Sequence, residues 1–500
     1  MRRAAIALLV AALTVPGLSA LETDQYAAWE VPLADAAPMV NAWFNRQLAA
    51  VVAEANRGKD APRPACWIAD RFQARIRYAA IFHPIEVWCD STGLIERYPD
   101  GWAGHDAFWR RTIYRDHAAL DISLWMPLGP TIRIGEVRIG TDKLAHFVSL
   151  GWQSFVRYRK LVADGVDPDM AVDTVIRWQI LGERNLLLGY RTSGVFSTSD
   201  LEADYRGLLF YRDLCEGPDP VLELVGGRWR IRRAIDIRRY VTPEWDESYE
   251  PQLFRPGRWK RIRPVLEGYC ETLDGPWVKA LWRRYRTHDT LTPVERIVLG
   301  EIRRGRLPDL GRYTIEGVCG RPVRPWSYEG AAEAEFPPID PASLEPLEAR
   351  IAAEEEDRPR RTFVLWRAGW YSPAGPAGSV ALLMAPFRRD QHCPESCELD
   401  GPFLQLTAGL AGGGVSLGWT QFIGRLHRDD RTMAEASLAW GVKGTVLRTW
   451  GDPWGERPER TFVGPGFEFS VARINLELQA LWAPDGSGDW SLAWGIGFGF

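Results

Sequence analysis

The chain has 500 residues, of which 46% are hydrophobic and 25% are charged, and its formal net charge is −4. This length suggests two or three domains, and the small net charge argues against a nucleic-acid partner. The basic residues are almost all arginines along the whole chain. Arginine-rich runs such as 255–263 are therefore interpreted as solvated faces.

The N-terminus has the pattern of a secretory signal peptide. Arg2 and Arg3 precede an apolar run at 4–15, and Pro16 and small residues follow up to a predicted cleavage site after Ala20. The run is too short to cross a bilayer, and no later stretch reaches about 18 consecutive apolar residues. The sequence therefore predicts an exported chain with no transmembrane helix.

An exported chain can form disulfides, and this chain has seven cysteines. Their positions favour one local bridge between Cys393 and Cys397 and a second between Cys66 and Cys89. The remaining three cysteines can form at most one further bridge, which leaves one of them without a disulfide partner: Cys215, Cys270 and Cys319. No CxxC pair occurs, which argues against a zinc ribbon or a thioredoxin-type redox site.

Residues 21–330 are predicted to form a mainly helical domain. Its helices are expected at about 35–57, 68–82, 141–163, 168–188 and 198–214, and less regular ones near 260–286 and 292–304. The alternating segment 131–139 predicts a hairpin or edge strand around Gly135. The acidic, proline-rich segment 331–360 indicates a linker that carries a short helix at 343–356.

From residue 361 onward, apolar residues recur at every second position, which predicts β-strands. Eight strands are expected at about 362–371, 379–387, 403–411, 414–424, 434–450, 462–472, 474–482 and 490–500. In the last strand, small residues alternate with Trp490, Leu492, Trp494, Ile496, Phe498 and Phe500. Arg367 and Gln421 are expected to interrupt the apolar face, and 390–402 is expected to be a turn.

The two faces of these strands differ in a way that indicates the fold. One face carries bulky apolar residues, whereas the other carries small or polar ones, as in a transmembrane barrel with lipid outside and side chains filling its lumen. A soluble sandwich would carry long charged side chains on its second face. Backbone groups in lipid must pair internally, so the sheet is predicted to close. A soluble lipocalin-like cup is the alternative.

The closing strand with its terminal Phe500 resembles the C-terminal signature of bacterial outer-membrane barrel proteins, over about residues 361–500. In that family the terminal aromatic strand is recognised by the barrel-assembly machinery. The resemblance implies an α+β multidomain protein of the Gram-negative outer membrane, with an eight-stranded antiparallel barrel in contact with lipid. Strand parity then places the 361 end, the 390–402 segment and the helical domain on the periplasmic side.

A second pattern lies in the helical domain. Asp142 and His146 are four residues apart on one predicted helix, and Asp200 and Asp204 have the same spacing on another, so each pair shares a helix face. Ser197 is a good helix N-cap. Three helices could therefore bring together Asp142, His146, Glu183, Asp200 and Asp204.

This region resembles the teicoplanin-resistance (VanZ-like) family, whose motif has Asp-Lys-x-x-His, then Glu, then Ser-x-x-Asp-x-x-Ala-Asn-x-x-Gly. The matching residues are Asp142, Lys143, His146, Glu183, Ser197, Asp200, Ala203 and Gly207. Asp204 stands where that family has Asn, and charged residues at 157–177 break the apolar helices that embed that family in the membrane. A closer resemblance, over about 130–270, is to uncharacterised exported bacterial proteins with DKLxHF followed by SGVFSxxDLxAxYxG.

Three interpretations of this cluster compete. It is a structural network that fixes helix register, or a site for a divalent metal held by the five residues, or a metal-free hydrolytic site. In the last case His146 is the general base and Asp142 or Glu183 orients it. No Ser or Cys has a nucleophile-elbow context. The chain is therefore expected to be either a binding or scaffold protein of the cell envelope or an envelope hydrolase acting on lipid, glycan or peptidoglycan.

Overall fold

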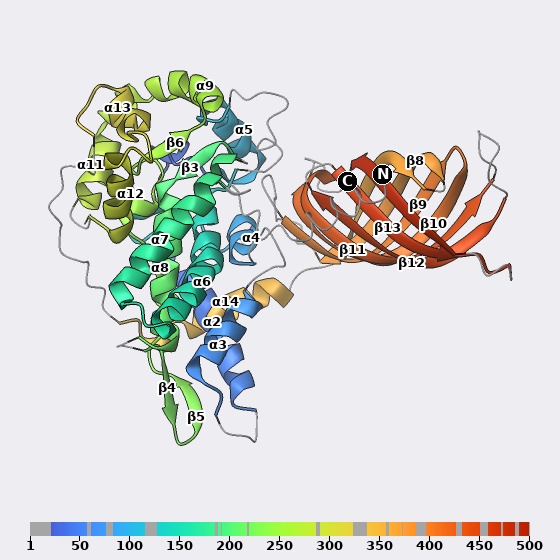
Figure 1. Ribbon diagram of the computed structural model, residues 1–500, viewed down its shortest axis with the longest axis horizontal. Helices are drawn as coiled ribbons and strands as arrows, with labels where there is room; N and C mark the ends of the chain where they lie inside the picture. The colour runs from blue at the N-terminus through green and yellow to red at the C-terminus, as the bar shows by residue number, and fades with distance from the viewer. Residues whose placement is uncertain are drawn as a thin grey trace. The chain divides into compact units, whose positions relative to one another are not determined.

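The computed structural model divides the chain into two compact units, largely the residues up to 353 and those from 354 onward (Figure 1). The predicted signal peptide at 1–20 and Cys393 lie outside the described residues, so both predictions stay untested. The structure describes residues 22–57, 62–76, 84–115, 128–185, 189–191, 193–217, 220–286, 291–323, 338–356, 360–372, 374–386, 397–426, 433–450, 459–471, 474–485 and 490–499.

The N-terminal unit is mainly helical, as predicted. Its α-helices are α2 (Ala37–Ala55), α3 (Ala65–Arg75), α4 (Pro84–Ser91), α5 (Gly101–Arg111), α6 (Thr141–Ala163), α7 (Pro168–Asn185), α8 (Thr198–Cys215), α9 (Pro256–Glu267), α10 (Cys270–Leu273), α11 (Pro276–Tyr285), α12 (Pro293–Arg303) and α13 (Ile315–Val318). The predicted short helix near 343–356 is α14 (Glu345–Glu356). The helix expected at 68–82 ends earlier, at Arg75.

Short strands and 3-10 turns connect these helices. The strands pair as β1 (Thr131–Ile134) with β2 (Val137–Gly140), β3 (Val195–Ser197) with β6 (Gln252–Phe254), and β4 (Leu222–Val225) with β5 (Arg228–Ile231). The 3-10 turns are η1 (Tyr26–Ala28), η3 (Gly189–Arg191), η4 (Ile237–Arg239), η5 (Pro243–Trp245), η6 (Gly311–Tyr313) and η7 (Pro341–Ser343). The hairpin predicted at 131–139 is confirmed, and Gly135 takes the positive φ of 59° that its turn requires.

Helices α6 and α8 form the centre of this unit. They approach closely because both carry glycine where they cross: a Cβ atom on Gly207 would lie 2.7 Å from the Cα atom of Gly151. Beside this crossing the rings of Phe147 and Phe210 are 5.0 Å apart, and both are fully buried. The close contact holds the N-terminal turns of the two helices side by side, which brings their polar residues together.

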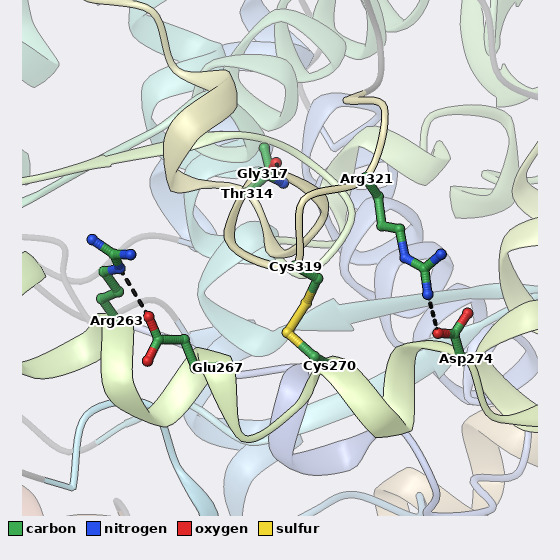
Figure 2. Close-up of a disulfide and its surroundings, with 8 residues drawn as sticks. All are labelled: Arg263, Glu267, Cys270, Asp274, Thr314, Gly317, Cys319 and Arg321. Carbon is green, nitrogen blue, oxygen red and sulfur yellow. Dashed lines mark hydrogen bonds and ion pairs between the residues drawn. A yellow bond between two sulfur atoms is a disulfide. The ribbon is translucent and has the colours of Figure 1, made fainter.

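Two disulfides join distant segments of the N-terminal unit. Cys66 on α3 pairs with Cys215 at the end of α8, with Cα atoms 4.7 Å apart. Cys270 on α10 pairs with Cys319, which follows α13, with Cα atoms 5.6 Å apart (Figure 2). The predicted bridge from Cys66 to Cys89 is wrong, because α3 packs on α8, and Cys89 is buried and belongs to neither bridge.

The second disulfide is the main covalent tie in its region. It closes a loop with a sequence separation of 49 residues, which in the chain-entropy model stabilises the fold by about 4 kcal/mol. Figure 2 shows two ion pairs near it, Arg263 with Glu267 on α9 and Arg321 with Asp274. All four side chains are about half exposed, so these pairs contribute little beside the disulfide.

The C-terminal unit is a closed barrel of eight antiparallel strands, as the alternating sequence predicts. They are β7 (Arg360–Tyr371), β8 (Gly375–Pro386), β9 (Cys397–Gly409), β10 (Gly412–Leu426), β11 (Met433–Thr449), β12 (Thr461–Val471), β13 (Ile474–Trp482) and β14 (Trp490–Gly499). Each strand pairs with its neighbour in sequence, and β14 pairs with β7 to close the barrel. The second half of the turn expected at 390–402 is strand, because β9 begins at Cys397.

The two faces of the strands alternate as expected. In β14, glycine and alanine point inward and are buried, whereas five large residues point outward with exposures of 47–70%: Trp490, Leu492, Trp494, Ile496 and Phe498. Phe500 lies outside the described residues. The barrel therefore presents an apolar outer surface and a small-residue or polar interior, which is the reverse of a soluble barrel.

The prediction that Arg367 interrupts the outer face is wrong. The even-numbered residues of β7 form that face, and Arg367 is buried on the other. Its guanidinium lies inside the barrel and makes two hydrogen bonds to the Glu468 carboxylate, at 2.9 and 3.1 Å. Lys443 Nζ lies 3.3 Å from the same carboxylate and 3.0 Å from Gln405 Oε1, and it also contacts Glu477. These side chains fill the lumen, as predicted for eight strands.

Among the described residues, no helix has both the length and the apolar character that crossing a bilayer requires. The helices of the N-terminal unit instead surround a common apolar core, which includes Trp29, Phe44, Phe147 and Tyr211.

Candidate functional site

The polar residues of the predicted cluster lie at the start of α6 and α8 and near the end of α7. Helix α6 begins at Thr141, and Gly140 is its N-cap. A side chain at 140 would collide with Thr23 and Asp142, so glycine is required there. Ser197 caps α8 as predicted, because its hydroxyl accepts a hydrogen bond of 3.2 Å from the Asp200 N–H.

Lys143 is the centre of the cluster and is fully buried. Its Nζ atom lies 2.6 Å from Asp142 Oδ2, 2.6 Å from Asp200 Oδ1 and 2.5 Å from Glu247 Oε1. An ammonium group has three protons to donate, and here each of them has its own carboxylate from a different segment of the chain. In the sequence Lys143 stands out only as a motif residue, and no pattern marks Glu247.

The charge state of Lys143 follows from this geometry. Burial alone lowers the pKa of an ammonium group, but Asp142, Asp200 and Glu247 outweigh burial and raise the pKa of Lys143 well above its usual value. Lys143 is therefore a permanent cation. It is not the neutral amine that a nucleophilic or Schiff-base lysine needs.

His146 lies one helical turn after Asp142 but does not bond to it. Its Nδ1 atom is 3.0 Å from Asp204 Oδ1, and its Nε2 atom is 3.5 Å from Asp200 Oδ2. Burial lowers the pKa of the imidazole, yet these two carboxylates outweigh that effect and raise it to about 10. At neutral pH His146 is a cation held between two aspartates. This state does not suit the predicted role of general base.

Glu183 on α7 reaches the same region and is 7% exposed. Burial and the nearby Asp200 raise its pKa well above the usual value, and His146 opposes this only in part. Its carboxyl group packs against η3, where Gly189 has a φ of 51° and any side chain would collide with the Glu183 oxygens. Its environment therefore favours the protonated form of the Glu183 carboxyl group.

The N-terminal segment and the segment after η5 complete the cluster. Thr23 donates a hydrogen bond of 2.5 Å to Asp142 Oδ1, and Ser197 donates one of 3.1 Å to Glu247 Oε1. Burial raises the pKa of Glu247 to about 8 although Lys143 lowers it. Burial and Asp200 also raise the pKa of the half-buried Glu22. Asp142 and Glu247 are thus each bonded to two protein groups.

Oxygens of Asp142, Asp200 and Glu247 lie within 4.8 Å of one another, a spacing that could hold a metal ion. The ammonium group of Lys143 contacts all three carboxylates, however. A metal ion cannot share that position with Lys143 without strong repulsion between the two cations. This inner position is therefore filled by the protein's own cation.

The structure brings the predicted residues together in two linked groups. His146, Asp200 and Asp204 form one group, and Lys143 joins Asp142 to Asp200 in the other. Glu183 lies within electrostatic range of His146 and Asp200. The predicted metal and catalytic roles of these residues stay predictions. Glu247 was missed because it lies in an acidic, non-helical segment at 244–250 that resembles a solvated run, although its acids are buried.

The fold defines the class of this protein: a helical unit with a buried lysine–carboxylate cluster, followed by a closed eight-stranded antiparallel barrel. No family model matches the chain, and no curated protein matches it either. The barrel agrees with the architecture of outer-membrane barrels, whereas the likeness around Asp142 and Asp200 rests on the motif residues alone.

Proposed function

We propose that this chain is an outer-membrane protein whose barrel anchors a periplasmic helical unit. The observation that carries the proposal is the closed barrel with an apolar outer face and an ion-paired interior. Such a surface is stable in hydrocarbon, because the closed sheet leaves no backbone edge unpaired. In water it would expose a large continuous apolar patch.

The width of the apolar band supports this proposal. On β11 the outward apolar residues run from Trp440 to Val446 and end at the exposed Arg448. The eight residue-to-residue steps from Trp440 to Arg448 span about 26 Å along a strand, or roughly 20 Å along the axis at a tilt of about 40°. That height is close to the lipid-facing band of outer-membrane barrels, which is about 25 Å.

Tryptophans with polar partners lie near both ends of the part of β11 whose side chains the structure describes, residues 439–449. Trp440 donates its indole N–H to Gln421 Oε1 at 2.7 Å, and Trp450 donates to the Leu410 carbonyl oxygen at 3.1 Å. Indole rings favour the membrane interface because the ring is apolar and its N–H is polar. Gln421, which interrupts the outer face as predicted, therefore has an interfacial role in this proposal.

The topology supports one orientation in the membrane. Because β14 pairs antiparallel with β7, the start of β7 and the end of β14 lie at the same end of the barrel. The helical unit precedes β7, so we place that end on the periplasmic side. The disulfides Cys66–Cys215 and Cys270–Cys319 suit that oxidising compartment.

Within this proposal the helical unit binds or scaffolds another component of the envelope. The buried cluster serves mainly to hold α6, α8 and the segment around Glu247 in register, because Lys143 joins carboxylates from all three. The hydrolase alternative has less support, because both ring nitrogens of His146 face carboxylates.

Membrane insertion can be tested with a matched pair of arginine substitutions. Val442 on the barrel and Leu224 on the β4–β5 hairpin are 52% and 47% exposed. In a lipid-embedded barrel, V442R costs about 2–4 kcal/mol near the bilayer midplane. We therefore expect V442R to lose outer-membrane assembly and L224R to keep it.

The readout is the amount of chain in the outer-membrane fraction and its heat-modifiable migration on SDS gels. Wild type and L224R should migrate differently with and without boiling, whereas V442R should lose that difference. A wild-type chain recovered only in the soluble periplasm, or equal behaviour of V442R and wild type, would show that the barrel is a soluble cup.

A further inference from the structure

Three arginines surround a single carboxylate where α7 and α12 pack together, and a fourth arginine lies beside them. Helix α7 supplies Arg177 and Arg184, and the end of α12 supplies Arg304 and Arg306. The carboxylate belongs to Glu301. Its Oε1 atom lies 2.5 Å from Arg177 Nη1, 3.0 Å from Arg304 Nη1 and 3.4 Å from Arg306 Nη1. Arg184 donates a hydrogen bond to the backbone carbonyl oxygen of Arg306. These four arginines are called the arginine group.

The backbone at the end of α12 holds part of this group in place. The helix ends at Arg303, and Gly305 then takes a φ of 68°, which favours glycine. The Gly305 N–H donates to the Ile302 carbonyl oxygen, and the Arg306 N–H donates to the Glu301 carbonyl oxygen, both at 2.9 Å. These two bonds define a Schellman motif. The turn reverses the chain and fixes the point from which Arg306 reaches back to Glu301.

The arginine group carries more positive charge than its protein partners offset. Glu301 is the one acid that forms ion pairs with it among the described residues. Asp173, four residues before Arg177 on α7, pairs instead with Arg296 at 3.3 Å. A guanidinium is always charged and has five N–H donors, so most donors of the group have no acceptor in the described part of the chain. The like charges repel one another, and a bound anion would offset that repulsion.

The free donors of the group face solvent. The Glu301 side chain is 9% exposed, whereas the arginine side chains around it are 37%, 51% and 65% exposed: Arg177, Arg304 and Arg306. The carboxylate therefore lies under the guanidinium groups and holds them from the protein side. The outer side of the group is open to a ligand.

We propose that the arginine group binds a phosphate group, with Arg184, Arg304 and Arg306 as the main donors. A planar guanidinium fits two phosphate oxygens with paired N–H bonds. A phosphomonoester offers three such oxygens and up to two negative charges, which match several guanidinium groups at once. A carboxylate offers two oxygens and one charge, and Glu301 already provides that.

The surface beside the arginine group indicates two sources of the phosphate. Leu181 is 58% exposed, and it shares a face of α7 with Arg177 and Arg184 through spacings of four and three residues. A phospholipid headgroup brings a phosphate and an apolar chain, and it fits both features. Free phosphate in the periplasm fits the arginines alone. The lipid source rests on the proposed membrane location, whereas phosphate binding itself does not.

Equilibrium dialysis of the full chain in a nonionic detergent tests the site directly. The probe is radiolabelled inorganic phosphate at low ionic strength. We expect one phosphate bound per chain, and weaker binding as sodium chloride is added, because salt screens exposed charges.

Two variants on the same segment separate binding from general attraction to positive charge. R306M removes a guanidinium from the arginine group, whereas R296M removes one of similar exposure, 65% against 61%, that pairs with Asp173. We expect R306M to weaken phosphate binding roughly tenfold or more. R296M should change it little, because Arg296 lies about two helical turns before Arg304 and its charge is screened. R306K keeps the charge but loses the planar fork, so its affinity should be intermediate.

Nanodiscs separate the two sources of phosphate. The full chain is placed in nanodiscs of phosphatidylcholine, with or without phosphatidic acid, and the dialysis is repeated. If the site takes lipid headgroups, phosphatidic acid occupies it and inorganic phosphate no longer binds. If it takes free phosphate, both kinds of nanodisc bind equal amounts. Either result supports a phosphate site.

The proposal is overturned if wild-type chain with native circular dichroism binds no phosphate at millimolar concentration in detergent. It is also overturned if R306M and R296M weaken binding equally, or if R306M binds like wild type. The arginines would then only offset the partial negative charge at the C-terminal end of α12. Both substitutions lie at exposed pairs that contribute little to stability, so native circular dichroism is expected for both. The detergent measurements do not depend on insertion into a bilayer, so their failure leaves the proposed membrane location intact.

Discussion

Lys143 touches carboxylates from three segments that are distant in sequence: its own helix, the start of α8 and the segment after η5. Its four-carbon side chain is fully buried, which is unusual for lysine. A buried ion pair adds little over a well-packed apolar group, but a broken one is costly. The stability of the helical unit should therefore depend strongly on this one side chain.

Replacing Lys143 by methionine keeps much of the side-chain volume and removes the charge. Asp142, Asp200 and Glu247 would then be buried without their cation, so we expect K143M to lose about 3–5 kcal/mol of unfolding free energy. Urea unfolding of the full chain, followed by helical circular dichroism, measures this loss. K160M on the exposed part of α6 is the control and should unfold like wild type. Equal stability of the two variants would contradict this role.

His146 makes the stability of the helical unit pH-dependent. Its pKa is about 10 in the folded chain and about 6.5 in the unfolded chain. At a pH between these two pKa values, the folded state binds one more proton than the unfolded state. The stabilisation by protonated His146 is therefore complete below about pH 6.5 and is lost as the pH rises to about 10. We expect the free energy of unfolding to fall by up to roughly 1.4 kcal/mol per pH unit in that window. In H146Q the free energy of unfolding should fall less steeply over this pH range. If the free energies of wild type and H146Q fall in parallel with pH, His146 is not the source of the pH dependence.

At this scale the sequence indicated part of the cluster. Asp142, His146, Asp200 and Asp204 share helix faces through their spacing of four, and the structure brings them together. Pairing within the set could not be predicted: Asp142 faces Lys143 and not His146, because Lys143 points inward from the adjacent position of the same turn. Residues in irregular segments, Glu22 and Glu247 among them, have no period that would indicate burial.

Among the elements, the crossing of α6 and α8 sets the geometry of the site. A Cβ atom on Gly207 would collide with the carbonyl oxygen of Phe147 and the backbone of Gly151. G207A should therefore push the two helices apart and cost about 1–3 kcal/mol, despite the better helix propensity of alanine. The measurement is again unfolding of the full chain by circular dichroism.

G300A on α12 is the matched control. The Cβ atom there would meet only the flexible end of Arg304, at 3.4 Å. Both substitutions gain about the same helix propensity, so we expect G300A to be neutral or stabilising. If G207A behaves like G300A, the two helices can separate without loss, and the close crossing does not hold the site.

Within the barrel, the ion pair of Arg367 and Glu468 links β7 to β12 across the lumen. R367M leaves Glu468 with only Lys443 as its cation, and we expect a loss of about 3–5 kcal/mol in the unfolding of the barrel. The urea concentration at which heat-modifiable migration disappears reports this change. R448M, on the exposed outer face of β11, should have little effect.

Strand positions were predictable from the period of two, and all eight strands lie close to their expected ranges. The side of the sheet on which Arg367 lies could not be predicted. A single charged residue can lie on either face of a strand, and the register of β7 with β8 and β14 decides which face it is. Disulfide pairing was also beyond the sequence, because Cys66 meets Cys215 through the packing of α3 on α8.

For the molecule as a whole, assembly of the barrel is expected to depend on its last described strand, β14. Phe500 closes the alternating strand that resembles the signal recognised by the barrel-assembly machinery. We therefore expect F500S to reduce the amount of folded barrel in the outer membrane. W490S, at the other end of β14 and 70% exposed, is the control and should assemble nearly normally. Equal assembly of wild type and F500S would show that Phe500 is not part of the signal.

The sequence by itself determined the class of each unit, because periods of 3.6 and two, and the sorting of large and small residues onto separate faces, are local properties of the chain. The sequence also indicated four ionisable residues of the buried cluster: Asp142, His146, Asp200 and Asp204. Only the tertiary structure decided which charge faces which, since Lys143 and Glu247 come together through the packing of segments far apart in sequence. Electrostatic partners depend on distances in space, and the chemistry of the cluster follows from those distances.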